Sequence, residues 1–227
     1  RIYDQFLAAQ VQSSQAAASS ANQLNSLLSN LSQFMSDRNS GLSSALTSFF
    51  DAADGLVSKP SDATARHVFL GAISGLQSRF NLIAEQASAL ADQVNSQVQT
   101  QIGAVNGAVR QIASLNDQIV KAESSAGAPA NDLRDQRDQL VQTLNQSIKA
   151  SSVETSDGQY NIYVGNGQAL VQGNRSFELT TVPSPYDPSQ LSVGYKSPAG
   201  TVIVDEAQLS GGALGGLMEF RSKTLIQ

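Results

Sequence analysis

The feature that most constrains the fold is a stretch from about Asp62 to Glu123 in which apolar residues recur every three or four positions. This spacing places side chains on one stripe of an α-helix, and no proline interrupts it. The apolar positions are Phe80, Ile83, Ala87, Leu90, Val94, Val98, Ile102, Val105, Val109, Ile112, Leu115 and Ile119. Such a helix would be roughly 90 Å long. It has to be covered by other helices, from its own chain or from neighbouring copies, so the sequence favours an architectural role.

The long stretch is not a uniform heptad. Val94, Val98 and Ile102 are spaced by four residues, a stutter that locally relaxes a left-handed supercoil. Gly103 and Gly107 follow, and each costs about 1 kcal/mol relative to alanine inside a helix. The two glycines indicate either a loosely specified surface or close contact with the backbone of another helix, and the sequence leaves both interpretations open.

The same spacing predicts other helices. One runs from Ile2 to Phe34 and a shorter one from Leu42 to Val57, which ends at a break where Ser61 or Asp62 can cap the long helix. After a turn at 124–130, Asn131 is a suitable N-cap for a further helix. Because this turn is short, that helix is expected to fold back on the long one as an antiparallel hairpin.

Arg137 lies on the apolar side of this returning helix, among its leucines. Reflecting positions about the turn places it opposite Asn116 and Asp117 of the long helix. We therefore predict that Arg137 bonds to one of these two residues and fixes the register of the hairpin, as a lone polar residue in an apolar seam can do. The alternative is that Arg137 extends past the leucines to water.

After Ala150 the period changes from helical to twofold, in short alternating runs separated by glycine- and proline-containing turns. This predicts an antiparallel β-element of about six strands. Helical spacing returns from Ala213. The predicted fold is mainly α with a β insertion: an elongated bundle of long antiparallel helices plus a small antiparallel β-element. The predicted segments are a long-helix bundle over 1–150, the β-element over 151–210, and the start of a helix that returns to the bundle over 211–227.

Composition excludes several function classes. The chain has 227 residues, a net charge of −5 and no basic run, which argues against nucleic-acid binding. It has no cysteine, so disulfides, thiolate metal sites and cysteine nucleophiles are excluded. The sequence contains no run of 18 apolar residues, so it predicts no transmembrane helix.

Candidate catalytic features are also weak. His67 is the only histidine, so neither a Ser-His-Asp triad of ordinary form nor a histidine metal site is expected around it. The segment 211–216 is rich in glycine and opens a helix after a strand, but it lacks the Lys and Ser/Thr of a phosphate-binding loop. A flexible connection is the favoured interpretation. We predict no enzyme and no cofactor.

An acidic cluster on the returning helix has two interpretations. Asp132, Asp135 and Asp138 are three residues apart and could suggest a site for a hard cation. Arg134 and Arg137 are interleaved with them, which favours ion pairs within the hairpin or to another subunit. We therefore predict no metal and treat Asp132, Arg134, Asp135 and Asp138 as candidate subunit contacts.

Several stretches together resemble the flagellar hook-associated protein 1 family. They are Arg1-Ile2-Tyr3-Asp4-Gln5-Phe6-Leu7 with Gln10, Pro60-Ser61-Asp62, Asn131-Asp132-Leu133-Arg134-Asp135-Gln136-Arg137-Asp138-Gln139-Leu140, Asp157-Gly158, Asn161-Ile162-Tyr163-Val164-Gly165-Asn166-Gly167-Gln168 and Gly211-Gly212-Ala213-Leu214-Gly215-Gly216-Leu217. The run around Arg137 and the Gly-Asn-Gly-Gln turn are the most specific, and the stretches cover nearly the whole chain.

The resemblance implies a structural subunit of the bacterial flagellum, exported by the flagellar type III apparatus and located outside the cell. Members of the family form a ring on the hook on which the filament is later built. The implied partners are copies of the chain itself, the hook protein, the second junction protein and an export chaperone bound through a terminus missing here. The family's outermost coiled-coil segments are expected to be missing as well, so this chain alone is expected to be monomeric.

Other functions remain open at this point. A cytoplasmic coiled-coil adaptor or sensor would also use long helices to bind protein partners, although the inserted β-element counts against it. Filament flagellin and the second hook-associated protein share long helices of this kind. An enzyme with its site in the β-element is the weakest alternative, because that segment lacks His and Cys.

Overall fold

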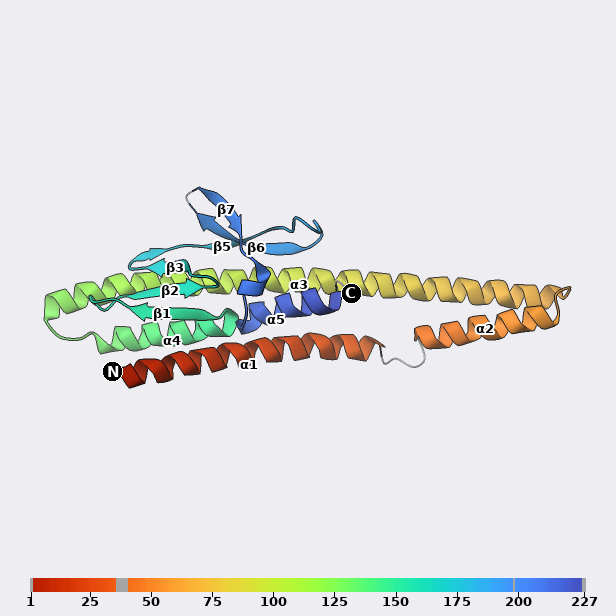
Figure 1. Cartoon of the computed structure of the whole chain (residues 1–227), viewed down its shortest axis with the longest axis horizontal. Helices are drawn as coiled ribbons and strands as arrows, with labels where there is room; N and C mark the ends of the chain where they lie inside the picture. The colour runs from red at the N-terminus through yellow and green to blue at the C-terminus, as the bar shows by residue number, and fades with distance from the viewer. Residues whose placement is uncertain (1, 36–40, 198, 226–227) are drawn as a thin grey trace. The chain divides into compact units, whose positions relative to one another are not determined.

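A computed structural model describes residues 2–35, 41–197 and 199–225 (Figure 1). Its helices are α1 (Ile2–Met35), α2 (Leu42–Ser58), α3 (Ala63–Ala126), α4 (Asn131–Ser147) and α5 (Gly212–Phe220). A 3-10 turn, η1 (Glu206–Gln208), precedes α5, and a π-helical turn, η2 (Arg221–Leu225), follows it. The long helix predicted from the apolar spacing is confirmed as α3, which has 64 residues.

The ends of α3 explain its boundaries. At the start, the Asp62 carboxylate accepts a hydrogen bond from the Thr64 N–H at 2.8 Å, so Asp62 satisfies one of the free donors of the first turn. At the other end, the chain turns at Gly127, whose φ of +61° suits glycine. The following helix begins at Asn131 itself and is preceded by Ala130, so the prediction that Asn131 is its N-cap is wrong by one residue.

The chain divides into two compact units, one formed by residues 1–26 with 93–227 and the other by residues 27–92. The first contains all the strands, together with α4 and α5. The second contains the end of α1, all of α2 and the beginning of α3. The division into 1–150, 151–210 and 211–227 expected from the sequence follows the order of elements along the chain and stays a prediction.

The β-element comprises two antiparallel sheets, with seven strands among the described residues. The first has the order β1-β2-β3-β4, and the second β5-β6-β7. The strands are β1 (Ala150–Glu154), β2 (Tyr160–Val164), β3 (Gln168–Gln172), β4 (Arg175–Ser176), β5 (Leu179–Pro183), β6 (Leu191–Ser197) and β7 (Gly200–Ile203). The sequence predicts one element of about six strands, so antiparallel pairing is confirmed but the single element is corrected to two sheets.

The break between the sheets has a physical cause on α3. Leu179 begins β5 and pairs with Tyr195 of β6 on one side. On its other side, its N–H and C=O bond to the side chain of Asn106 on α3. The outer edge of β5 is therefore occupied at this point by a helix side chain instead of another strand.

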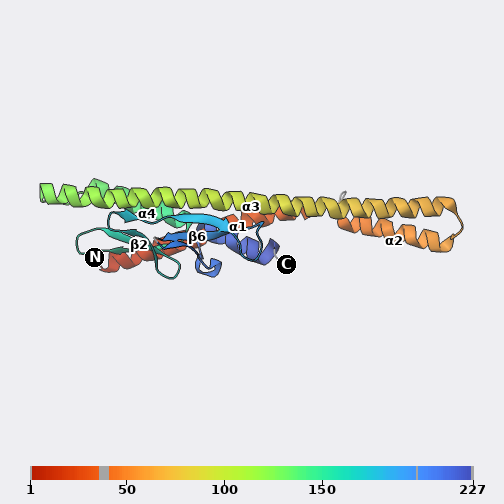
Figure 2. The same ribbon diagram turned by 90° about the horizontal axis from the view of Figure 1, so that it is seen from above.

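The core of the first unit lies along the second half of α3. Its predicted stripe is buried at Val94, Val98, Ile102, Val105, Val109, Ile112 and Ile119. The other elements contribute buried apolar side chains at Val141, Leu144 and Ile148, at Ile162, Leu170, Val171 and Leu179, and at Leu214, Leu217 and Phe220. In both views α4 lies beside the end of α3 (Figures 1 and 2). The antiparallel α3–α4 hairpin predicted from the short turn is therefore present.

The glycines at 211–216 let α5 pack closely, which the expectation of a flexible connection did not anticipate. A Cβ atom on Gly216 would lie 2.5 Å from the carbonyl oxygen of Ser20 on α1, and one on Gly212 would lie 2.4 Å from the nitrogen of Ile148. Gly103 and Gly107 differ, because a Cβ on either would meet nothing within 4 Å in the described chain. Close contact at these two glycines is therefore not observed here.

The second unit is a helical hairpin with a thin core. The rings of Phe49 on α2 and Phe69 on α3 are 5.5 Å apart, and Ala52 is buried. Phe80, which belongs to the predicted stripe, is 51% exposed. The stripe is thus covered along the second half of α3 but not along its first. None of the described helices combines the length and the hydropathy that a membrane span requires.

Candidate functional site at the helix–sheet junction

Three asparagines on α3 face the β-element. Asn95, Asn106 and Asn116 are eleven and ten residues apart. Three turns of an α-helix contain about 10.8 residues, so the three side chains lie on the same side of α3. This line of asparagines connects one helix to both sheets.

Asn106 and Asn95 each bind the backbone near a strand of the second sheet. Asn106 donates to the carbonyl of Leu179 at 2.8 Å and accepts from the Leu179 N–H at 2.9 Å, as a neighbouring strand would. Asn95 donates to the carbonyl of Ser189 at 2.8 Å and accepts from the N–H of Leu191 at 3.1 Å. The side-chain amides therefore satisfy peptide groups that lack a strand partner there.

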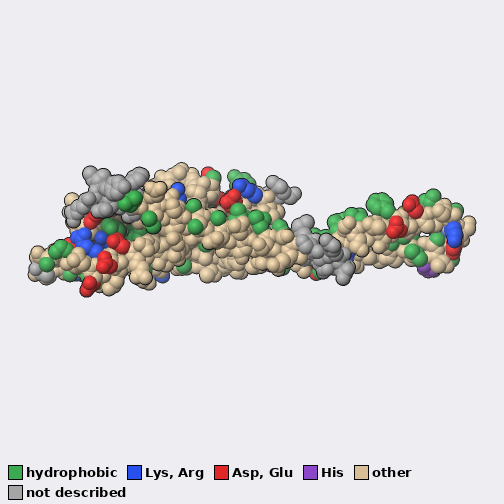
Figure 3. Space-filling view, turned by 90° about the horizontal axis from the view of Figure 1, so that it is seen from below, with side chains coloured by type: hydrophobic (Ala, Val, Ile, Leu, Met, Phe, Trp, Pro, Cys, Tyr) green, Lys and Arg blue, Asp and Glu red, His purple; other side chains and the backbone are tan. Residues whose placement is uncertain are grey.

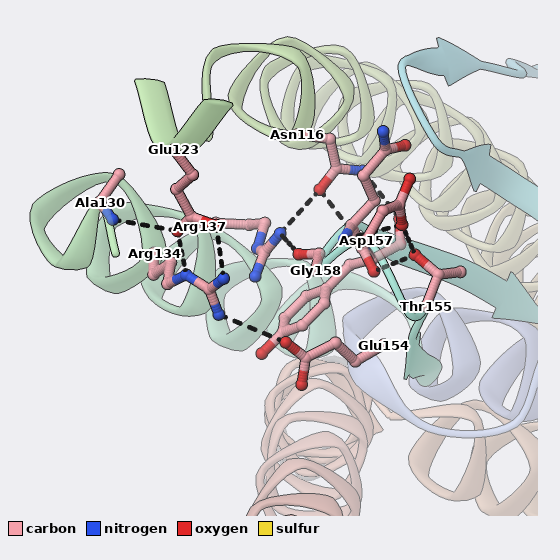
Figure 4. A network of polar contacts seen from close by, with 11 residues as sticks. Asn116, Glu123, Ala130, Arg134, Arg137, Glu154, Thr155, Asp157 and Gly158 are labelled. Carbon is pink, nitrogen blue, oxygen red and sulfur yellow. Dashed lines mark hydrogen bonds and ion pairs between the residues drawn. The ribbon is translucent and has the colours of Figure 1, made fainter. Parts of the chain in front are cut away.

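Asn116 does the same for the first sheet and is fully buried. Its amide nitrogen donates to the carbonyls of Tyr160 and Gly173, at 2.8 and 2.7 Å. Its oxygen accepts from the N–H of Tyr160 and from Arg137, both at 3.0 Å (Figure 4). One side chain thus joins α3, α4, β2 and the turn after β3.

Arg137 completes this cluster from α4 and is only 1% exposed. Its Nη1 donates to Asn116 and, at 2.7 Å, to the carbonyl of Gly158. Its guanidinium carbon lies 3.6 Å from the centroid of the Tyr160 ring. Burial lowers the pKa of Arg137 from its usual value, and burial with the nearby charge of Asp138 raises the pKa of Tyr160. The cation is held by neutral acceptors and an aromatic face.

The structure places one of the two predicted partners of Arg137 in contact with it. Arg137 contacts Asn116, one of the two residues reflected onto it. Asp117 forms an ion pair with Lys121 at 2.6 Å, so it is not the partner of Arg137. The alternative in which Arg137 reaches water is wrong, because its side chain is buried.

Arg134 closes the hairpin nearer the turn. Its Nε and Nη2 donate to the two carboxylate oxygens of Glu123 at 2.7 and 2.9 Å, and its Nη1 lies 3.4 Å from Glu154 on β1. Glu123 also accepts from the Ala130 N–H at 3.0 Å. The hydrogen bonds from Arg134 and Ala130 lower the pKa of Glu123 to about 2. Glu123 thereby satisfies a donor just before α4, at the residue preceding Asn131.

The candidate subunit contacts separate into two groups. Arg134 is engaged within its own chain by Glu123 and Glu154. Asp132, Asp135 and Asp138 have exposed side chains on α4. Within the described ranges, no group of three or more His, Asp or Glu side chains is arranged to hold a metal ion.

Sequence reasoning missed Asn95, Asn106 and Arg221. Arg221 is buried and donates to the carbonyl of Leu191 at 2.5 Å, and it contacts Glu206. The recurrence of asparagine after eleven and ten residues on one long helix is the signal that could have found the first two. Nothing local distinguishes Arg221 from a surface arginine.

Replacing Asn106 by alanine is expected to lower the free energy of unfolding by about 2 kcal/mol, because the N–H and C=O of Leu179 lose their partner. Urea unfolding measures the loss, and faster amide hydrogen exchange at Leu179 locates it. The control is alanine at the exposed Asn25, which should stay within about 0.5 kcal/mol. Unchanged exchange at Leu179 would show that this contact does not hold β5.

Replacing Glu123 by glutamine is expected to make stability less dependent on pH. The pKa of Glu123 is lower in the folded state, about 2 against an ordinary 4.5, so its ionised form stabilises the fold above pH 4.5. That contribution is lost as the pH falls from 4.5 to about 2. The difference in melting temperature between the two proteins should be constant near neutrality and narrow across this window. A difference that does not vary with pH would contradict the assignment.

Comparisons of this chain with known proteins agree on one family. The family model described as the flagellar hook-associated protein FlgK helical domain matches residues 28–227. Flagellar hook-associated protein 1 of Salmonella typhimurium is 37% identical over 229 residues, which cover 100% of this chain and 41% of that protein. The Escherichia coli K12 protein of the same name is 36% identical, over 100% of this chain and 42% of its own length.

A solved structure agrees with this result. The flagellar hook junction protein FlgK from Burkholderia pseudomallei superposes with a TM-score of 0.90 at 34% sequence identity, over 96% of this chain and 39% of that one. The chain therefore spans about two fifths of the length of the relatives it matches. The chain belongs to the flagellar hook-associated protein FlgK helical domain family.

Proposed function

We propose that this chain is part of a structural subunit of the hook–filament junction of the bacterial flagellum. The observation that carries the proposal is the match over the whole chain to hook-associated proteins 1, together with the fold shared with a hook junction protein. The subunit is exported, acts outside the cell, and packs against copies of itself and against neighbouring axial proteins, namely the hook and the second junction protein.

The helix–sheet junction suits a structural role, because it holds several elements in one arrangement. Asn95, Asn106 and Asn116 tie both sheets to α3, and the Arg137 cluster ties α3 to α4. Buried polar groups of this kind restrict packing to one arrangement, since any shift leaves them without partners. In this proposal Arg137 and Asn116 fix the register of the hairpin. Asp132 and Asp135 are available for contacts between subunits, and Asp138, which also faces Tyr160, is a further candidate.

The family is one of structural proteins, which supports a role without catalysis. The surface of the long helices also suits side-by-side packing, because only 15% of residues are charged and Ser, Gln and Asn fill the difference. Neutral polar surfaces can be buried against one another at less cost than charged ones. The chain taken alone is proposed to be monomeric.

Deleting the gene segment that encodes this chain tests the proposal. The expected result is cells with hooks but without filaments, with the filament subunit released into the medium, because the layer that receives the filament is absent. Restoring the segment should restore filaments. Cells that keep normal filaments after the deletion would overturn the proposal.

A further inference from the structure

The hairpin of the second unit exposes a row of apolar side chains on one face, while Val68 and Leu82 are exposed elsewhere on α3. Phe50 and Val57 on α2 and Leu70, Ile73 and Phe80 on α3 are all exposed, Val57 by 78%. We call these five residues the apolar ridge. Hydrophobic side chains are visible at the surface of this hairpin in Figure 3. None of the five is charged, and an exposed apolar patch of this kind commonly marks an interaction surface.

The same hairpin carries a groove lined mainly by small residues. Its small lining residues include Ser44, Ala45 and Ser48 of α2 and Gly71, Ala72 and Gly75 of α3, and the larger Leu76 and Arg79 line it as well. We call the six small residues the small-residue groove. A Cβ atom on Gly71 or Gly75 would meet nothing within 4 Å, so the groove is open at both glycines.

Helical geometry places the ridge and the groove on opposite sides of the hairpin. On α3 the line facing α2 passes through Phe69, whose ring contacts Phe49. At about 100° per residue, Leu70 and Ile73 turn to one side of this line and Ala72 and Gly75 to the other, while Phe80 stays within about 20° of the line. The same count on α2 separates Phe50 and Val57 from Ser44 and Ser48. Because α2 and α3 are antiparallel, the two apolar sets share one side.

We infer that the apolar ridge of one copy of this chain docks in the small-residue groove of another. Helices ordinarily pack with the side-chain ridges of one helix in the grooves of the other, and small residues leave such a groove open. The ridge and the groove lie on opposite faces of one hairpin, so copies that join through them associate head to tail. Such a contact repeats from copy to copy and gives a ring or a filament. The inference rests on the proposed function, since it names the surface through which the subunits of the junction meet.

The size of the contact agrees with a chain that is monomeric when dilute. Five partly exposed apolar side chains form a patch on the order of a few hundred Å². A stable pair buries roughly 1,000 Å² or more. Each contact is therefore weak alone and becomes effective when many subunits are held in one assembly.

The absence of cysteine makes cross-linking a clean test. Gln77 is exposed on the ridge side of α3, and Ser48 lines the groove. Copies carrying Gln77→Cys are mixed at high concentration with tagged copies carrying Ser48→Cys, and the mixture is oxidised. We expect the mixed disulfide dimer in several-fold excess over either homodimer. The reference pair replaces Gln77→Cys by Gln142→Cys, an exposed position on α4.

A filled groove supplies the second readout. Gly75→Leu, placed in the Ser48→Cys copy, should lower the mixed cross-link several-fold, because leucine occupies the open groove. Gly103→Leu fills an equally open position outside the groove and should leave the yield unchanged. Circular dichroism of each variant serves to check that its helices are retained.

Three results would overturn the inference: homodimers as abundant as the mixed dimer, no excess over the Gln142→Cys pair, or no effect of Gly75→Leu. The first would indicate a symmetric ridge-to-ridge contact, and the second an occupant other than a second copy. Failure of the proposed function is seen separately, as normal filaments after the gene segment is deleted.

Discussion

Replacing Arg137 by alanine is expected to lower the free energy of unfolding by about 3–4 kcal/mol. The variant loses two hydrogen bonds from a cation, leaves the Asn116 oxygen and the Gly158 carbonyl short of a donor, and opens a cavity against the Tyr160 ring. No longer burying a cation offsets part of this loss. Urea unfolding followed by circular dichroism measures the change.

Two further variants separate the charge from the geometry. Arg137→Lys keeps the cation but loses the planar group that stacks on Tyr160, so an intermediate loss is expected. Asp135→Ala removes an exposed side chain from the same helix and should stay within about 0.5 kcal/mol. A loss below about 1 kcal/mol for Arg137→Ala would contradict the central place of this cluster in the fold.

Replacing Gly212 by alanine is expected to cost about 3 kcal/mol or more. Gly212 has a φ of +68°, a conformation that costs a side-chain-bearing residue about 1–2 kcal/mol. Its Cβ would also lie 2.4 Å from the nitrogen of Ile148, so the junction of α4 and β1 has to move, which adds about 1–3 kcal/mol. Thermal and urea unfolding of the variant measure the sum.

Gly127→Ala is the matched control for this prediction. Gly127 has a similar φ of +61°, but a Cβ there would meet nothing within 4 Å. It should therefore show only the conformational cost. If the two variants lose the same stability, the close approach of α5 to the end of α4 contributes nothing.

The elements that could be predicted from sequence are those set by local periodicity. Apolar spacing predicts α3 to within a few residues at each end, because a helix repeats over short distances. Reflection about a short turn places Arg137 opposite Asn116, since an antiparallel hairpin has little freedom of register. Both results follow from geometry that neighbouring residues already determine.

The features that could not be predicted depend on contacts between distant segments. The sheet divides because Asn106 on α3 binds Leu179, 73 residues away, and a helical asparagine shows no such partner in the sequence. Phe80 and Val94 both belong to the apolar stripe on α3, yet Phe80 is exposed and Val94 is buried. Periodicity thus predicts that an apolar stripe exists but not what covers it.

The similarity of the chain to known proteins bears on the alternative functions considered from the sequence. The hook-associated family is shown by 37% identity over the whole chain, and nothing in the comparisons favours an adaptor, a sensor or an enzyme. The junction role is our proposal for this chain, which spans about two fifths of the length of the relatives it matches.

Immunogold labelling with antibodies raised against this chain tests the central claim most directly. On intact flagella of the source bacterium, the account predicts gold particles in one narrow band where the hook meets the filament. Flagella from cells lacking the gene segment serve as the control for antibody specificity. Labelling along the whole filament, or none on flagella that bind antibodies against the hook, would contradict the account.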